Sequence, residues 1–384
     1  MSQFSFETAP KIICEQGGAD RLGEIARSLG ITRLFLVTDV GLIKAKLIDG
    51  ARASLATAGI ACTVFSDVLA DPPEVNVQAA VDAARAAGVD GVVGFGGGSS
   101  LDTAKLVALL GCTPQALPDI YGIGLARGPR LPLIQVPTTA GTGSEVTPIS
   151  ILTTPSHEKK GVVSPLLYPD VALLDSRLTL GLPPAITAMT GVDAMVHAVE
   201  AFTTRLKKNP LSDALALKAL QLLYTNLPAA VGDGQDAAVR ENMLLGSLFA
   251  GMAFANAPVG AVHALAYPLG GHYHLPHGLT NSLVLLPVLE FNLPVAETLY
   301  AELGRAILPA LAGTDDREAA AAFVAAIRER VAAMPYAQSL RDAGIKAADL
   351  PMLAEDAMKV QRLLVNNPRD VAFDDALAIY QAAF

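Results

Sequence analysis

Short hydrophobic runs alternate with amphipathic stretches through the first half of the chain. Between the runs, the apolar residues of 77–87 and 101–110 recur at helical spacing. A regular alternation of strand and helix predicts a parallel, doubly wound sheet. The five strands predicted in this way lie at residues 34–38, 62–65, 91–94, 131–136 and 171–174.

The pattern changes after Leu180-Gly-Leu-Pro-Pro184. Strand signals nearly vanish beyond this point, and helical spacing continues to the end of the chain. We therefore predict an α/β domain with a Rossmann-like parallel sheet over residues 1–182 and an all-α domain over residues 183–384. The clearest helical patterns of the second domain lie at 193–202, 212–223, 237–252 and 318–334.

Composition supports this two-domain interpretation. The chain has 384 residues, which at about 150 residues per domain suggests two domains. It is 52% hydrophobic but only 5% aromatic and has no Trp, so its core must consist mainly of Ala, Val, Leu and Ile. The net charge is −9 and no basic run occurs, which argues against a nucleic-acid partner because phosphate binding needs a cationic face.

One long interval without charged residues resembles a membrane segment at first sight. Between Glu241 and Glu290 there is no Asp, Glu, Lys or Arg. Asn256, Pro258 and His263 interrupt its apolar run, so we interpret the interval as buried helices around a polar site and expect no membrane partner. The three cysteines, which suit neither disulfides nor a CxxC site, and the lack of a signal-like N-terminus favour a cytoplasmic protein.

Two loops rich in small residues follow predicted strands. Gly94-Phe-Gly-Gly-Gly-Ser99 precedes a predicted helix, where backbone N–H groups can approach a pyrophosphate. Ser99 replaces the last glycine of GxGxxG, and a tight turn without a ligand is the alternative. The second loop, Pro137–Glu145, ends a strand of the same predicted sheet, so the two loops are expected to converge. Asp39 ends the first strand, where it either binds an adenosine ribose, which favours NAD over NADP, or caps the next turn.

Histidines and one aspartate suggest a metal site in the second half. Asp193 and His197 are four residues apart in a helical pattern and so share one face. His263 and His277 would lie about 21 Å apart on one straight helix, and Pro268, Gly270, Gly271 and Pro276 are candidates for the break that folds the chain back. An Asp and several His without Cys suit Fe²⁺ or Zn²⁺ with a position open for substrate. The alternatives are an ordinary ion pair and hydrogen-bonded core histidines; the remaining histidines of this stretch are His272 and His274.

Four segments together resemble the iron-dependent (group III) alcohol dehydrogenases, near the lactaldehyde/propanediol oxidoreductase-like members. These segments are Gly96–Lys105, Pro137–Thr147, Gly191–Ala201 and His263–Gly278. The resemblance implies a dinucleotide-binding domain, a helical domain that binds metal and substrate, and a metal in the cleft between them. It also implies NAD, one divalent metal with Fe²⁺ favoured over Zn²⁺, and a homodimer.

The resemblance assigns roles residue by residue. It implies that the metal ligands are Asp193, His197, His263 and His277, with His272 and His274 outside the first shell. It places Gly97, Gly98, Ser99 and Asp102 at the first cofactor loop, Thr138, Thr139 and Thr142 at the second, Lys160 on the ribose side and Asp39 at the adenosine ribose.

Two residues depart from the pattern of the relatives. Tyr267 stands where many relatives carry a second histidine, and its phenol either relays a proton or packs. Arg362, just before Asn366-Asn-Pro, either receives a substrate carboxylate or lies on a surface. Tyr267, His272 and Arg362 are the candidate catalytic residues.

The predicted activity is hydride transfer between NAD and a small alcohol, diol or hydroxy acid, or the corresponding aldehyde. The first alternative is a lyase or synthase of the same fold that recycles bound NAD, as in dehydroquinate synthase. The second is a nucleotide-binding protein without catalysis. A 2-His-1-carboxylate oxygenase would leave the two loops unexplained.

Overall fold

The computed structural model describes residues 3–156 and 158–384. These divide into two compact units: Thr8–Gly181, and Leu182–Phe384 together with the described residues that precede Thr8. The short N-terminal segment joins the second unit through a reciprocal hydrogen-bond pair. Glu7 N donates to Asn256 Oδ1 (2.7 Å), and Asn256 Nδ2 donates to Glu7 O (2.8 Å).

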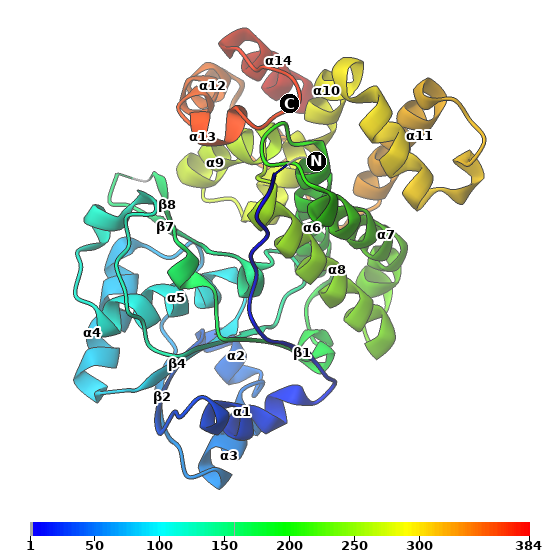
Figure 1. Ribbon diagram of the computed structural model, residues 1–384. Helices are drawn as coiled ribbons and strands as arrows, with labels where there is room; N and C mark the ends of the chain where they lie inside the picture. Colours follow the sequence, from blue (N-terminus) through cyan, green and yellow to red (C-terminus); the bar gives the residue numbers. More distant parts are fainter. Residues whose placement is uncertain (1–2, 157) are drawn as a thin grey trace. The chain divides into compact units, whose positions relative to one another are not determined.

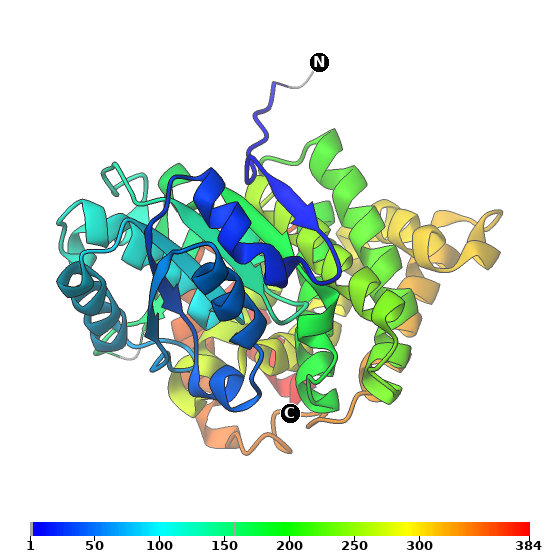
Figure 2. The ribbon, with the colours of Figure 1, turned by 90° about the horizontal axis from the view of Figure 1, so that it is seen from below.

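The first unit is built on a six-stranded parallel sheet (Figure 1). Its strand order is β1-β9-β6-β4-β2-β3, with β1 at one edge, where it is the blue arrow of Figure 2. The predicted parallel, doubly wound sheet is confirmed. The strands are β1 (Ile12–Cys14), β2 (Arg33–Val37), β3 (Ala61–Phe65), β4 (Gly91–Gly96), β6 (Leu133–Pro137) and β9 (Val171–Leu174).

Helices cover both faces of the sheet because successive strand residues point to opposite sides. Leu34 and Leu36 pack in one core with α1 and α3, whereas Phe35 and Val37 pack in the other core with α4 and α5. The strand β2 is therefore apolar on both faces, and β4, β6 and β9 are likewise buried along their whole length, which is typical of parallel sheets. The helices of this unit are α1 (Leu22–Ser28), α2 (Val40–Lys44), α3 (Asp49–Thr57), α4 (Glu74–Ala87) and α5 (Gly98–Cys112).

A second, three-stranded sheet was not predicted. Its order is β5 (Gly122–Ile123), β8 (Lys159–Val163) and β7 (Ile149–Thr153), and β7 runs antiparallel to β8. Burial alternates along β7, as expected for a strand with one face on the core. The short run Ile-Ser-Ile-Leu-Thr carried this signal, but the glycine- and hydroxyl-rich loop before it favoured irregular structure.

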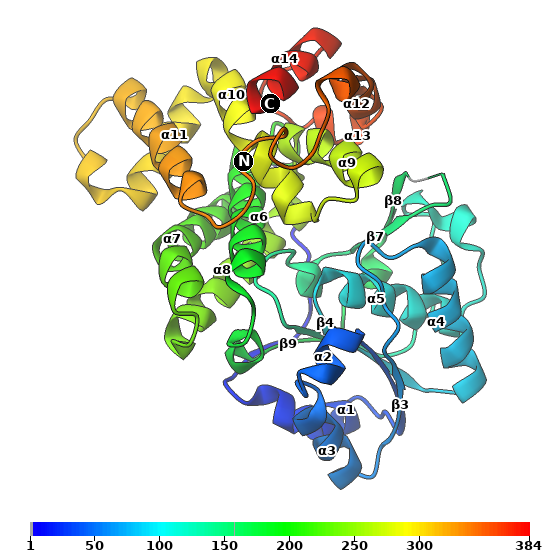
Figure 3. The ribbon, with the colours of Figure 1, turned by 180° about the vertical axis from the view of Figure 1, so that it is seen from behind.

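The second unit is helical, as predicted (Figure 3). The helix α10 is long and apolar enough to cross a membrane, and 61% of its most apolar window is buried within the structure. The helices are α6 (Pro184–Thr203), α7 (Pro210–Gly232), α8 (Ala237–Asn256), α9 (Ala261–Tyr273), α10 (His277–Ile307), α11 (Asp316–Ala332), α12 (Leu350–Met358), α13 (Gln361–Leu364) and α14 (Phe373–Ala383).

Candidate metal centre and nucleotide-binding loops

Three helices of the second unit bring four potential metal ligands together. Asp193 and His197 lie one turn apart on α6, His263 lies on α9, and His277 is the first residue of α10. One ligand atom from each of these side chains lies within 4.8 Å of the others. Asp193, His197 and His263 are buried, whereas the His277 side chain is 36% exposed. The cluster is therefore open on the side of His277.

The chain reverses between α9 and α10, and this reversal brings His277 back to His263. The prediction that Pro268, Gly270 and Gly271 break the helix is wrong, because all three lie inside α9. The reversal comes later, at His274, whose φ is +53°, and Pro276 then precedes the first turn of α10. A proline ring inside a helix is tolerated here because α9 is buried and held by its neighbours.

A glycine next to His277 permits the close approach of α10 to α6. A Cβ atom on Gly278 would lie 2.3 Å from the carbonyl oxygen of Met189 on α6. Any larger residue would push α10 away from α6. The glycine therefore sets the distance between His277 and the two ligands on α6.

The arrangement of nitrogen and oxygen atoms fits a divalent cation. His197 Nε2 and His263 Nε2 face each other at 3.0 Å, and Asp193 Oδ1 lies 3.9 Å from His263 Nε2 and 3.8 Å from His277 Nε2. Ligand atoms that lie about 2 Å from one ion are at most roughly 4 Å apart, so small side-chain movements complete the coordination. Three imidazoles and one carboxylate form a donor set that suits Fe²⁺ or Zn²⁺.

The charge state of Asp193 also favours a cation. Burial disfavours its carboxylate, but His197, His277, His263 and a hydrogen bond from Asn281 outweigh that effect and keep the pKa of Asp193 below its usual value. Asn281 Nδ2 donates to Asp193 Oδ1 at 2.6 Å. The buried aspartate is therefore ionised at neutral pH.

Glu200 orients one of the histidines. Its Oε2 accepts from His263 Nδ1 at 2.6 Å, and its Oε1 accepts from Val262 N at 2.7 Å. With Nδ1–H donating to Glu200, the Nε2 lone pair of His263 faces the cluster. Sequence reasoning missed both Glu200 and Asn281. The spacing of these residues could have revealed them in the sequence. Glu200 lies three residues after His197, and Asn281 lies four residues after His277, so each is about one helical turn from a predicted ligand.

Of the three candidate catalytic residues, Tyr267 and Arg362 lie near the Asp/His cluster and His272 does not. Tyr267 lies one turn after His263, and its ring centroid is 6.1 Å from that of His277. Arg362 Nη2 lies 3.5 Å from Tyr267 Oη. His272 lies outside the cluster, where its Nε2 pairs with Asp356 Oδ2 at 2.6 Å.

The two loops of the first unit lie side by side at the ends of neighbouring strands, as expected. β4 pairs with β6 up to Gly96 opposite Pro137, and α5 begins at Gly98 without a side-chain cap. A Cβ atom on Gly98 would lie 2.8 Å from Thr142 Cγ2. Glycine thus lets the first turn of α5 approach Thr142 closely. Because α5 has no side-chain cap, the N–H groups of its first turn are the kind of donors that bind an anion.

Asp102 fastens the two loops together. Its Oδ1 accepts from Ser144 Oγ (2.6 Å) and Lys105 Nζ (3.4 Å), and its Oδ2 accepts from Ile151 N (2.8 Å). Both of its carboxylate oxygens are therefore used within the protein. Asp102 therefore connects α5 to the second loop and to β7.

The remaining cofactor candidates occupy varied positions. Asp39 caps α2, since its Oδ1 accepts from Leu42 N at 3.1 Å, so the capping alternative is present. Ser99 Oγ accepts from Asp71 N at 3.2 Å, and Lys160 is exposed and pairs with Glu158. Thr138 is buried, whereas Gly97, Thr139 and Thr142 are partly exposed.

Glu145, at the end of the second loop, gives a testable pH dependence of stability. Its carboxyl is buried, Oε1 has no hydrogen-bond partner in the described chain, and burial raises its pKa from 4.5 to about 7. The folded protein holds the Glu145 carboxyl proton more tightly than the unfolded chain does. The free energy of unfolding therefore falls as the pH rises from 4.5 to about 7 and this carboxyl ionises. Above that pH range, the ionised Glu145 lowers the free energy of unfolding by about 3 kcal/mol.

We expect Glu145→Gln to raise the free energy of unfolding by up to about 3 kcal/mol near pH 8 and by much less near pH 5. Urea unfolding at the two pH values measures this difference. Glu158→Gln, a change at an exposed residue, is the control. An equal effect of Glu145→Gln at both pH values would contradict the burial argument.

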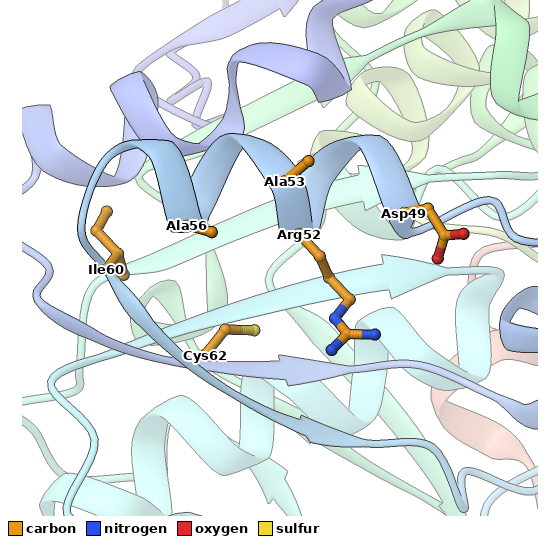
Figure 4. Close-up of a pocket in the computed structure, with 6 residues that line it drawn as sticks. All are labelled: Asp49, Arg52, Ala53, Ala56, Ile60 and Cys62. Carbon is orange, nitrogen blue, oxygen red and sulfur yellow. The ribbon is translucent and has the colours of Figure 1, made fainter.

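A surface depression elsewhere in the first unit contains none of the candidate catalytic or metal-ligating residues. It lies against α3 and β3 and is lined by Asp49, Arg52 and Cys62, among others (Figure 4). Burial raises the pKa of the Cys62 thiol, so it is protonated at neutral pH and is a poor nucleophile. None of the lining residues belongs to the cluster or the two loops.

The helical unit carries an open cluster of one Asp and three His. The other unit carries a doubly wound sheet with two converging glycine-rich loops. Together these features define a metal-dependent dehydrogenase. Family comparison agrees with this class. Residues 9–176 match the model of the iron-containing alcohol dehydrogenases, and residues 187–384 match the C-terminal model of the same family. The chain belongs to the iron-containing alcohol dehydrogenase family and is an oxidoreductase.

Individual relatives cover the whole chain. A probable alcohol dehydrogenase, EutG of Escherichia coli, is 39% identical over 99% of this chain and 94% of its own length. The crystal structure of a 1,3-propanediol oxidoreductase superposes with a TM-score of 0.96 at 35% identity and covers 100% of both chains. A sulfoacetaldehyde reductase from Bifidobacterium kashiwanohense, solved with NAD⁺, has a TM-score of 0.87 at 30% identity and covers 100% of this chain and 99% of its own.

Proposed function

We propose that the protein interconverts a small alcohol and its aldehyde with NAD and one divalent metal, Fe²⁺ in preference to Zn²⁺. The observation that carries the proposal is the convergence of Asp193, His197, His263 and His277 within 4.8 Å. Glu200 supports it, because a carboxylate behind a histidine is a recurrent partner of metal ligands. The proposed setting is a cytoplasmic homodimer that binds neither nucleic acid nor membrane.

The proposed NAD site is formed by the two loops. The N–H groups of Gly97, Gly98 and Ser99 receive the pyrophosphate at the start of α5, where the helix dipole favours anions. Thr138, Thr139 and Thr142 contact the cofactor from the second loop, and Lys160 lies on the ribose side. The second carboxylate oxygen of Asp39 accepts from the adenosine ribose and disfavours NADP. The NAD⁺ complex of the sulfoacetaldehyde reductase supports this choice of cofactor.

A divalent cation held by Asp193, His197, His263 and His277 would supply Lewis-acid chemistry to the substrate oxygen, and NAD held by the two loops would supply the hydride acceptor or donor. The protein supplies position and charge. Glu200 keeps the His263 Nε2 lone pair turned toward the cluster, and Asn281 keeps Asp193 Oδ1 in place. Tyr267 is half-buried with its ring beside that of His277, and its hydroxyl holds or passes the proton of the substrate hydroxyl.

NADH formation tests the proposal. The protein is stripped of metal, reloaded separately with Fe²⁺ or Zn²⁺, and assayed with NAD⁺ and short alcohols, diols and hydroxy acids. We expect stoichiometric NADH with at least one of these classes and little activity with NADP⁺. Turnover without net NADH would identify a synthase that recycles NAD. Stoichiometric metal without turnover on any substrate would identify a non-catalytic nucleotide-binding protein.

A further inference from the structure

The exposed side chain of Arg362 lies next to Tyr267, beside the Asp/His cluster. Arg362 Cζ lies 5.7 Å from the centroid of the Tyr267 ring, and Nη2 lies 3.5 Å from Tyr267 Oη. The same ring lies 6.1 Å from that of His277, centroid to centroid. One phenol therefore separates the guanidinium from a member of the cluster. Within residues 3–156 and 158–384, no Asp or Glu forms an ion pair with Arg362.

The backbone at Arg362 is fixed firmly to the helices that carry the cluster. Asn366 Nδ2 donates to Arg362 O (3.1 Å) and to Val259 O (2.9 Å), just before α9. The buried amides of Asn367 and Asn292, on α10, exchange hydrogen bonds of 2.8 and 3.0 Å. Buried hydrogen bonds of this kind fix register, so the segment holds Arg362 at a set place next to Tyr267.

The neighbouring charges are already satisfied. On α12, Asp356 accepts from Lys359 Nζ at 2.6 Å and pairs with His272 Nε2 at 2.6 Å. Asp356 therefore pairs with those two groups and not with Arg362. The guanidinium has five N–H donors in a rigid fork that matches an oxyanion, and the described contacts use only one of its nitrogens.

We propose that Arg362 binds an oxyanion at the far end of the substrate, so that the preferred substrate is a short alcohol or aldehyde with a carboxylate, sulfonate or phosphate group. This inference rests on the proposed function and assigns its substrate class. The reacting oxygen lies at the cluster, and the anionic end passes the Tyr267 ring to reach the guanidinium. A charged, bidentate hydrogen bond recognises such a group selectively. A neutral alcohol leaves the arginine unused.

A matched substrate pair tests the proposal. γ-Hydroxybutyrate and the terminal butanediol have the same chain length and differ in the anionic end. We expect Arg362→Gln to lower kcat/KM for γ-hydroxybutyrate about 10- to 100-fold, the effect of losing one charged hydrogen bond, and to change the diol by less than about twofold. Arg362→Lys retains part of the preference. Lys359→Gln removes a positive charge three residues away and is expected to leave both substrates unaffected.

Calorimetric titration of γ-hydroxybutyrate in the presence of NAD⁺ gives a second readout that does not depend on turnover. Weaker binding to Arg362→Gln than to the wild type supports the inference. An equal loss on both substrates, a higher KM for NAD⁺ alone, or equal losses for Arg362→Gln and Lys359→Gln would overturn it. Binding that depends on Arg362 without NADH formation from any alcohol would refute the proposed function and still support the oxyanion site.

Discussion

Asp193→Asn is expected to remove most of the bound metal and to lower kcat/KM about 1,000-fold. The substitution keeps the shape of the side chain but removes the carboxylate, the one anionic donor among the four clustered ligand atoms. A cation that stabilises charge on the reacting oxygen contributes several kcal/mol, and each 1.4 kcal/mol corresponds to a factor of ten. Metal content by atomic emission and steady-state kinetics measure the two effects.

A stability measurement separates loss of metal from loss of fold. Because a metal that binds the folded state stabilises it, added Fe²⁺ or Zn²⁺ is expected to raise the Tm of the wild type and not that of Asp193→Asn. Asp213→Asn, which removes a carboxylate on α7 that pairs with Lys208, is the matched control and is expected to behave as the wild type. Stoichiometric metal in Asp193→Asn together with wild-type turnover would show that this carboxylate is not a ligand.

Elements whose stability depends on local pattern were predictable from the sequence. The five predicted strands are short apolar or β-branched runs, four of which are almost completely buried, and the main helices of the second unit carry apolar residues at helical spacing. The spacing of Asp193 and His197 likewise required only one helical turn. The sheet β5-β8-β7 was missed because the glycine- and hydroxyl-rich loop before β7 favoured irregular structure and because β8 is only partly apolar.

Contacts between segments that are far apart in the sequence could not be predicted from the sequence. The paired glycines and Pro268 suggested a break in the middle of α9, but burial among neighbouring helices keeps that region helical, and the chain reverses at His274 instead. Glu200 was read as part of a helical motif, since its role depends on the approach of α9 to α6. The contacts of Asp102 with Ser144 and Ile151, which join α5 to the segment after the second loop, were likewise not visible in the sequence, and its contact with a cofactor stays a prediction.

Glu200→Gln is the second change expected to have a large effect. Its carboxylate accepts one hydrogen bond from His263 Nδ1 and another from Val262 N, all within a buried site. The amide retains only one acceptor oxygen and places an NH₂ group against one of the two donors. His263 then loses its fixed orientation and part of its basicity as a ligand. Removing such a partner typically lowers metal affinity 10- to 100-fold.

Competition with a chelator measures this affinity, and kinetics at saturating metal complete the test. Because Glu200 acts through His263, we expect the dissociation constant of the metal to rise 10- to 100-fold and most of kcat to return when metal is in excess. Glu297→Gln, an exposed change on α10, serves as the control. If Glu200→Gln binds metal as tightly as the wild type, the hydrogen bond to His263 does not tune the site. If instead kcat stays low with the metal fully bound, Glu200 acts on the reaction itself and not only on the position of its ligand.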